Sequence, residues 1–381
     1  MTTTINNEHN KHNVPNLRFK EFQGEWITYK IKDVLSIGNG RDYKHLSNGE
    51  IPVFGTGGYM TSVDECLYDG ETTFIGRKGS INKPFYYNGK FWTVDTLFYT
   101  HSFNGITPKF TYCLFQTIHW LKYNEASGVP SLSKDTIEKI KIKIPGLEEQ
   151  NKIAKLMFAL DERITTQNKI IDKLQTLIKG IMVELQKQGV NKGTWKKVFL
   201  SDVLTERNER NTNLFQVFSV SVSQGVVNQV DYLGRSFAAK DTSKYNVVHY
   251  GDLVYTKSPT GSFPYGIVKQ SLNLENVAVS PLYGVYHPKS LAVGAYLHEY
   301  FMSEINTHNY LHPLIQKGAK NTINITNQRF LENCVLLPTN INELLQISKL
   351  LRSLNNKIKY QQDILQQYQK QKQYLLRQMF I

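Results

Sequence analysis

Several polar loops of the sequence carry side chains that can contact nucleic acid. One reads GRKGSINKP (residues 76–84), and TKSPTGS (residues 256–262) lies at the corresponding place later in the chain. Arg and Lys can hold guanine or phosphate, Asn and Gln can read adenine, and loop glycines let the backbone approach closely. A solvated turn is the alternative for any single position, but polar or basic character at the same place in both halves favours contact by the loops as groups.

The candidates in the first half of the chain are Asn39, Arg41, Tyr43, Lys44, Arg77, Lys78, Ser80, Lys83, Ser131, Ser133 and Lys134. Those in the second half are Lys257, Ser258, Thr260, Ser262, Lys317, Lys320, Asn321 and Asn324. Arg77 and Lys257 are the best single choices.

Motifs for catalysis are incomplete in this sequence. In NKPF (residues 82–85), Lys83 replaces the first Pro of an adenine-methyltransferase motif, and VFGTGG (53–58) lacks the helical run of a cofactor loop, which predicts a tight turn between strands. Asp42-Tyr43-Lys44 lacks the Pro-Asp of a nuclease motif, and no GxxxxGK[ST] occurs. His308 and His312 have the spacing of a zinc helix, but Asn309 replaces the required Glu and Pro313 follows, so we expect a surface helix end.

The composition favours a globular protein with an anionic partner. The chain has 381 residues, is 40% hydrophobic, and carries 45 basic against 32 acidic residues for a net charge of +13. Since no single tail holds this excess, nucleic acid is a more natural partner than a membrane. The three widely spaced cysteines indicate neither disulfides nor zinc, no apolar run could span a membrane, and we expect a cytoplasmic protein with residues 1–13 as a disordered lead-in.

The positions of these loops follow an internal repeat. WITYKIKDVL (26–35) recurs as WKKVFLSDVL (195–204), and the helical block at 141–164 recurs at 333–358. Short β-rich runs separated by Gly, Pro, Asn and Ser, together with helical stretches, predict an α+β domain in each copy. The predicted organisation, in chain order, is a lead-in (1–13), domain 1 (14–145), long helix 1 (146–188), domain 2 (189–338) and long helix 2 (339–381).

Each long helix has a coiled-coil seam with one polar break. Apolar residues alternate at spacings of four and three from Ile153 to Leu185 and again from Ile347 to Met379, with Lys372 as a weak point of the second seam. Gln167 and Gln361 occupy the same place in the two seams, which suggests that this pair fixes the register of the helices; amides that lean out to solvent are the alternative.

Connectivity predicts antiparallel helices. Domain 2 begins just after the first helix and ends just before the second, and a compact domain could not bridge two parallel rods of this length. The predicted fold is therefore two related domains joined by an antiparallel coiled coil, a dumbbell with a pseudo-two-fold axis. Such a molecule could read two half-sites on one duplex.

VPNLRFKEFQGEW (14–26), the IKDVL and LSDVL openings, and the block SGVPSLSKDTIEKIKIKIPGLEEQNKIAKLMFALDERI (127–164) resemble the specificity subunit of type I restriction-modification systems. The resemblance covers almost the whole chain from residue 14. It implies two target recognition domains that each read half of an asymmetric, bipartite double-stranded DNA site, and helices that set the spacing. It also implies docking of modification (methyltransferase) subunits and restriction (motor-nuclease) subunits. S-adenosylmethionine, ATP and magnesium would belong to those partners, so no cofactor is expected on this non-catalytic chain.

Two other functions are compatible with parts of this pattern. A scaffold that spaces protein partners would use the same helices with an incidental charge. A stand-alone methyltransferase or nuclease would require the motifs that are incomplete here. The sequence does not indicate the bases of either half-site, the oligomeric state of the isolated chain, or which surface binds which partner.

Overall fold

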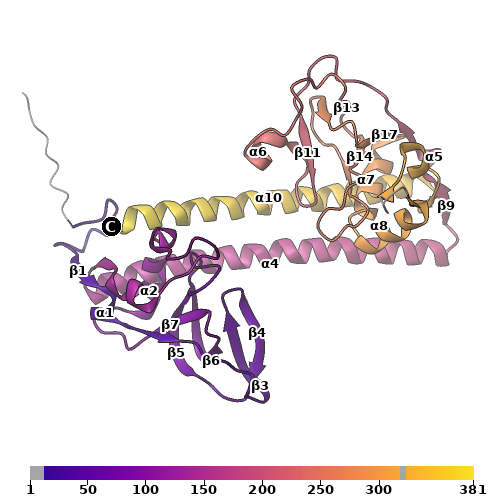
Figure 1. Cartoon of the computed structure of the whole chain (residues 1–381). Helices are drawn as coiled ribbons and strands as arrows, with labels where there is room; N and C mark the ends of the chain where they lie inside the picture. Colours follow the sequence, from indigo (N-terminus) through magenta and orange to yellow (C-terminus); the bar gives the residue numbers. More distant parts are fainter. Residues whose placement is uncertain (1–12, 318–322) are drawn as a thin grey trace, which may run out of the picture. The chain divides into compact units, whose positions relative to one another are not determined.

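The computed structural model describes residues 13–317 and 323–381. The chain divides into two compact units, one containing the chain up to Asn168 together with Ile364–Ile381, the other containing Lys169–Asp363. Both units combine helices and strands, and the long helices α4 (Leu147–Asn191) and α10 (Ile341–Met379) contribute residues to both (Figure 1). The α+β domains and the long helices predicted from the sequence are therefore present.

The first unit is built on a six-stranded sheet with the order β2-β7-β5-β6-β3-β4. All neighbours in it pair antiparallel except β3 and β6, which are parallel. The strands are β2 (Ser36–Asn39), β3 (Asn48–Gly55), β4 (Gly58–Val63), β5 (Tyr68–Gly76), β6 (Phe85–Thr93) and β7 (Leu97–His101). The other elements are β1 (Ile27–Lys30), α1 (Ile31–Val34), α2 (Pro108–Phe115), the 3-10 helix η1 (Trp120–Tyr123), α3 (Lys134–Lys139) and β8 (Lys141–Ile144), and β1 pairs antiparallel with β8.

Aromatic and aliphatic side chains make the core of this unit. Helix α2 starts at Pro108, whose fixed φ suits the first turn, and the Thr107 side chain accepts a hydrogen bond from Phe110 N. Its apolar face buries Phe110 and Phe115 completely, in one cluster with Trp26 and Trp120. Truncating an aromatic side chain at such a position costs about 3–5 kcal/mol.

The end of α10 packs on the start of α4 within the first unit. Lys372 forms an ion pair with Asp161, and the Arg163 guanidinium lies 5.7 Å from the centre of the Tyr368 ring. Residues later in α4 thus meet residues earlier in α10, which is the antiparallel direction that connectivity predicted. Lys372, the weak point of the predicted seam, is 13% exposed and has a charged partner. At the end of the chain, Phe380 stacks on Phe110 with ring centres 5.4 Å apart.

The second unit contains a four-stranded antiparallel sheet with the order β10-β17-β14-β15. The remaining strands form two-stranded pairs: β9 with β20, β11 with β12, β13 with β16, and β18 with β19. The strands are β9 (Trp195–Phe199), β10 (Leu204–Glu206), β11 (Phe218–Ser221), β12 (Gly225–Asn228), β13 (Asn246–Val248), β14 (Leu253–Tyr255), β15 (Val268–Gln270), β16 (Val277–Val279), β17 (Gly284–Pro288), β18 (Gln316–Lys317), β19 (Ile323–Asn324) and β20 (Cys334–Pro338). The short helices are α5 (Leu200–Val203), α6 (Gln229–Leu233), α7 (Leu291–Tyr300), α8 (Glu304–Leu311), η2 (His312–Leu314) and α9 (Asn327–Phe330).

The two units repeat one plan. In each, the first strand pairs antiparallel with the strand that precedes a long helix, β1 with β8 and β9 with β20. The order β2-β7-β5-β6 of the first sheet recurs as β10-β17-β14-β15 in the second. The internal repeat read from the sequence is therefore a repeat of topology.

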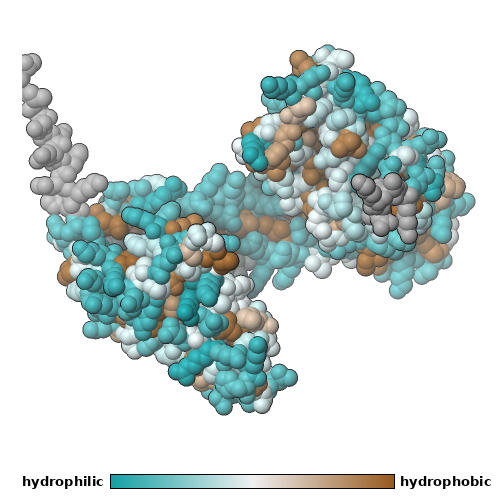
Figure 2. Space-filling view, in the orientation of Figure 1, coloured by the Kyte–Doolittle hydropathy of each residue, from teal (hydrophilic) through white to brown (hydrophobic). Residues whose placement is uncertain are grey.

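The main insertion in the second copy lies before its central strand. Residues 64–67 connect β4 to β5, whereas residues 229–252 connect β12 to β14 and include α6 and β13. Helix α6 buries none of its residues; Val230 within it is 50% exposed and Phe237, which follows it, is 58% exposed. In the space-filling view both units have a largely hydrophilic surface with apolar patches between the polar residues (Figure 2).

Helix α4 ends close to where α10 begins within the second unit. The Trp195 indole Nε1 donates a hydrogen bond to Glu343 at 2.8 Å, and the Thr339 hydroxyl donates to Thr194 O. Gly189 is required here, because an added Cβ would lie 2.0 Å from Trp195 Cδ1. The domain between the two helices therefore starts and finishes at one place.

Candidate nucleic-acid interface

The structure brings two of the candidate loops of the first unit together. Lys78 and Ser131 form an antiparallel bridge, and Gly79 N donates a hydrogen bond to Pro130 O at 2.8 Å. Leu132 N donates to Arg77 O at 2.9 Å. Loops that lie far apart in the sequence, residues 77–80 and 130–132, thus form one surface.

A third segment, the turn between β6 and β7 (residues 94–96), joins these two loops. Arg77 N donates to Thr96 O at 2.8 Å, and Arg41 N donates to Thr93 O at 2.7 Å, just before this turn. Gly40 allows the close approach, since a Cβ there would lie 1.9 Å from Val94 O. Asn39 and Arg41 are therefore held beside the Arg77 loop.

Most of the polar side chains of this surface face solvent. Asn39, Arg41, Lys44, Lys78, Ser80 and Lys83 are exposed. Arg77 is half-buried; its guanidinium lies 5.9 Å from the centre of the Phe98 ring and donates to Asp95 O at 3.3 Å. An Arg that is positioned by a ring and a carbonyl still has further N–H groups to offer a ligand.

Three candidates of the first unit have structural contacts. Tyr43 is half-buried against the cluster of Val53, Val63 and Trp92. Ser133 caps α3, because its hydroxyl accepts a hydrogen bond from Thr136 N at 3.2 Å. Lys134 forms an i, i+4 ion pair with Glu138 at 3.6 Å.

A carboxylate lies beside this cap. Hydrogen bonds from Thr136 and Ser133 to Glu125 hold the pKa of that carboxyl below its usual value. The end of this loop therefore has an acidic group next to Ser133.

Lys257 occupies the place of Arg77 in the second unit. Arg77 follows β5 and Lys257 lies just after β14, the equivalent central strand. Lys257 has a left-handed backbone with φ of +59°, which is uncommon for a residue with a Cβ. Burial lowers the pKa of its ammonium, and the nearby carboxylate of Glu206 acts in the opposite direction.

The remaining candidates of the second unit lie in two segments. Thr260 and Phe263 exchange backbone hydrogen bonds of 3.0 Å, the Thr260 hydroxyl donates to Ser258 O, and the Ser262 hydroxyl donates to Glu304. Lys317 ends β18 and pairs with Ile323, while Asn324 is exposed on β19. Lys320 and Asn321 lie outside the described residues.

Two of the suspected catalytic patterns have ordinary structural roles. VFGTGG forms a hairpin turn, with Gly55 of β3 paired with Gly58 of β4, as predicted. His308 and His312 stack on each other with ring centres 5.2 Å apart at the end of α8 and beside Tyr265. Among residues 13–317 and 323–381, no group of three His, Cys, Asp or Glu side chains could hold a metal ion.

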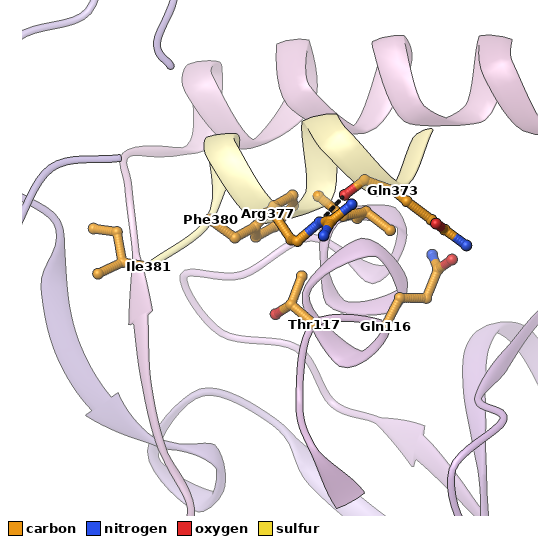
Figure 3. Close-up of a pocket in the computed structure, with 7 residues that line it drawn as sticks. Gln116, Thr117, Gln373, Arg377, Phe380 and Ile381 are labelled. Carbon is orange, nitrogen blue, oxygen red and sulfur yellow. Dashed lines mark hydrogen bonds between the residues drawn. The ribbon is translucent and has the colours of Figure 1, made fainter. Parts of the chain in front are cut away.

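No helix in the described part of the chain is both long enough and apolar enough to cross a membrane. A pocket of about 430 Å³ in the first unit lies between α2 and the end of α10, and its lining residues include Gln116, Thr117, Gln373, Arg377 and Phe380 (Figure 3). Arg377 Nε donates to Gln373 O at 3.2 Å there. Arg377 is the charged side chain among the lining residues, and no Asp, Glu or His side chain of the described residues lines this pocket.

The structure also brings two segments to the first surface that the sequence did not indicate as DNA contacts. One is the turn between β6 and β7, which holds the candidate loops together. The other is the tip of the β3–β4 hairpin, where Thr56 Oγ1 is the atom nearest to the Cβ position of Gly79, at 4.0 Å. The glycines of GTGG could have indicated a turn near a ligand, but strand pairing alone determines which loop the turn meets.

Part of the chain matches a known protein family. Residues 23–176 match the family described as type I restriction modification DNA specificity domain. The specificity subunit of the type I restriction enzyme MjaVIII from Methanocaldococcus jannaschii is 33% identical over 128 residues, 32% of this chain and 28% of that protein. The specificity subunit of the type I restriction enzyme MpnII from Mycoplasma pneumoniae is 28% identical over 144 residues, 35% of this chain and 44% of that protein. The chain thus spans less than half the length of these two relatives.

The fold as a whole is similar to a solved structure. The crystal structure of the type I restriction-modification S subunit from M. genitalium matches with a TM-score of 0.67 and 11% identity, covering 97% of this chain and 99% of that one. The predicted fold class of two related α+β domains with two long helices is therefore confirmed.

Residues 23–176 are thus similar to a type I restriction modification DNA specificity domain, and the curated relatives that match part of the chain are type I specificity subunits. The resemblance found in the sequence is thereby confirmed. Both of these curated relatives are named as specificity subunits of type I restriction enzymes.

Proposed function

We propose that this chain is the DNA-binding specificity subunit of a type I restriction-modification complex and that it recognises a bipartite, asymmetric site. The observation that carries the proposal is the repeat itself. A cation follows the same central strand in both units, Arg77 after β5 and Lys257 after β14, on two domains that have diverged in their loops. Two related readers with different loops suit two half-sites of different sequence.

The partners follow from this function. The long helices scaffold modification subunits, which hold S-adenosylmethionine and methylate adenine, and restriction subunits, which use ATP and magnesium. The chain itself takes no cofactor, and its site of action is the cytoplasm, where the DNA lies.

The register of the helices sets the spacing between half-sites. Gln167 is 6% exposed, which suits a seam residue, and we assign it and Gln361 to fixing the register. Replacing both with Leu should stabilise the helices and let the complex accept a second spacer length. If the double variant keeps a single spacer length on a library of spaced duplexes, the register role is wrong.

The test of the proposed function is a footprint with matched variants. The full chain, purified with its modification subunit, should protect two separated half-sites on duplex DNA. Arg77→Ala should weaken binding about tenfold, because one Arg contact to a base is worth roughly 1–3 kcal/mol, and should relax the first half-site only. Lys139→Ala, at an exposed cation of the same unit, is the control. One continuous protected site, or equal effects of both variants, would contradict the proposal.

A further inference from the structure

The β3–β4 hairpin carries two large side chains that face solvent in succession. Tyr59 is 63% exposed and Met60 is 50% exposed, whereas successive residues of a regular strand point to opposite faces. Strand β4 is the last strand in the order of this sheet and forms its edge (Figure 1). The hairpin is therefore an edge element with an apolar, uncovered side.

A β-bulge explains why both side chains turn outward. Val53 pairs with Thr61, but Phe54 pairs with Tyr59, so Met60 is an extra residue on β4 that has no opposite partner. Bulges of this kind bend the strand and redirect its side chains, and they are frequent next to functional sites. The bulge lies only one residue pair from the turn, since Gly55 pairs with Gly58.

A glycine leaves room for the Met60 side chain against the hairpin. A Cβ on Gly55 would lie 2.7 Å from Met60 Sδ, so the thioether lies directly over the backbone of the opposite strand. The Tyr59 hydroxyl is 3.1 Å from Ser62 Oγ on the same strand. Both side chains therefore lie near the tip of the hairpin and remain largely exposed there.

The tip lies beside the candidate DNA-contact loop. Thr56 Oγ1 is the atom nearest to the Cβ position of Gly79, and Gly79 sits in the loop with Arg77, Lys78 and Ser80. The charges around the tip are also suited to DNA. Strand β4 has no charged residue, while Glu50 and Asp64 lie at the opposite end of the hairpin.

We propose that Tyr59 and Met60 form an apolar wedge that enters a groove of the duplex at the first half-site and partly unstacks one base step. Proteins that bend DNA insert apolar side chains such as Phe, Leu and Met between bases while nearby cations hold the phosphates. Here Lys78 and Lys83 are exposed cations of the adjacent loop. This assignment rests on the proposed function and adds a reading element that senses how easily a step deforms.

The test uses the full chain with its modification subunit and duplexes that carry the recognised sequence. 2-Aminopurine replaces adenine at successive steps of the half-site read by residues 14–145. The wild-type complex should raise the fluorescence of one step, because unstacking removes its quenching. The double variant Tyr59→Ala and Met60→Ala should lose this signal and bind about tenfold more weakly, whereas Tyr59→Phe with Met60→Leu should retain both.

Leu121→Ala is the matched control, since Leu121 is 49% exposed in the same unit and lies outside the hairpin. Full signal and affinity in the double Ala variant, with weakened binding in Arg77→Ala, would overturn the wedge and leave the proposed function standing. Weakened assembly with the modification subunit and an unchanged fluorescence signal would also overturn it, because the pair would then contact protein. Absence of split-site binding by the wild-type complex would overturn the wedge together with the proposed function.

Discussion

The two domains hold equivalent cations in different ways. In the first, Arg77 belongs to a surface of several segments that backbone hydrogen bonds tie to the turn between β6 and β7. In the second, Lys257 has a left-handed backbone and a half-buried side chain whose pKa burial lowers. The central strands are repeated, but the loops that follow them are not.

This difference shows what the repeat preserves. Strand order is maintained by buried pairing and core packing, which tolerate few changes, whereas surface loops accept insertions and new side chains at little cost. The insertion with α6 occurs in the second domain, and the long β3–β4 hairpin joins the main sheet only in the first. Two domains with the same strand order and different loops can recognise two different DNA sequences.

The largest expected effect is on the free energy of unfolding, and it tests whether the two units unfold separately. Phe330 is fully buried and stacks on Tyr255 and Tyr286, with ring centres 4.7 Å apart in both pairs. Phe330→Ala should destabilise the second unit by about 3–5 kcal/mol. Hydrogen exchange should then accelerate in its strands and remain slow in β5 and β7, with the exposed Leu282→Ala as control. Equal acceleration in both units would mean that they unfold together.

A pH effect should be confined to the second unit. Lys269 is 3% exposed and donates to Val222 O at 2.6 Å, and burial lowers the pKa of its ammonium from 10.5 to about 8. Above pH 8 the folded chain releases this proton while the unfolded chain keeps it up to pH 10.5, so stability rises with pH in this window.

The measurement compares the wild type with Lys269→Met. From pH 8 to pH 10.5 the free energy of unfolding of the wild type should rise relative to that of Lys269→Met, by at most about 3 kcal/mol. Urea titrations at several pH values follow this difference. A constant difference would show that the lysine keeps its proton when folded.

The ion pair of the first unit should have a smaller effect. Lys372 is its cation, and Asp161 Oδ2 is buried with no hydrogen-bond partner. Lys372→Met should cost about 1–3 kcal/mol, because it leaves a half-buried carboxylate unpaired. Adding Asp161→Leu should recover most of the loss, since an apolar pair can replace a buried ion pair. Additive losses in a thermal melt of the double variant would show that the pair is not coupled.

The inserted segment should have the smallest effect on stability. Val230 and Phe237 are half-exposed and α6 buries no residue, so Val230→Ser with Phe237→Ser should change the free energy of unfolding by less than about 0.5 kcal/mol. Chemical denaturation measures this directly. A loss above about 2 kcal/mol would mean that these side chains pack in solution.

The sequence predicted the repeat, the long helices and their direction, because regular apolar spacing and connectivity depend on short-range rules. From the sequence alone Lys372 is a weak point of the second seam, because its ion-pair partner Asp161 lies on the other long helix and the sequence does not indicate the pairing. Ser133 was predicted to contact DNA, although a Ser directly before a helix is also a typical N-cap, which is its role at α3. The hairpin tip beside Gly79 was missed because sheet order determines which turns meet.

The most direct test of the two-reader account exchanges residues 14–145 for those of another family member. Sequencing of methylated adenines in cells that carry the chimera and its partner subunits would give the new target. The account predicts that one half of the split target changes while the other half and the spacer are kept. A change in both halves, or in neither, would contradict it.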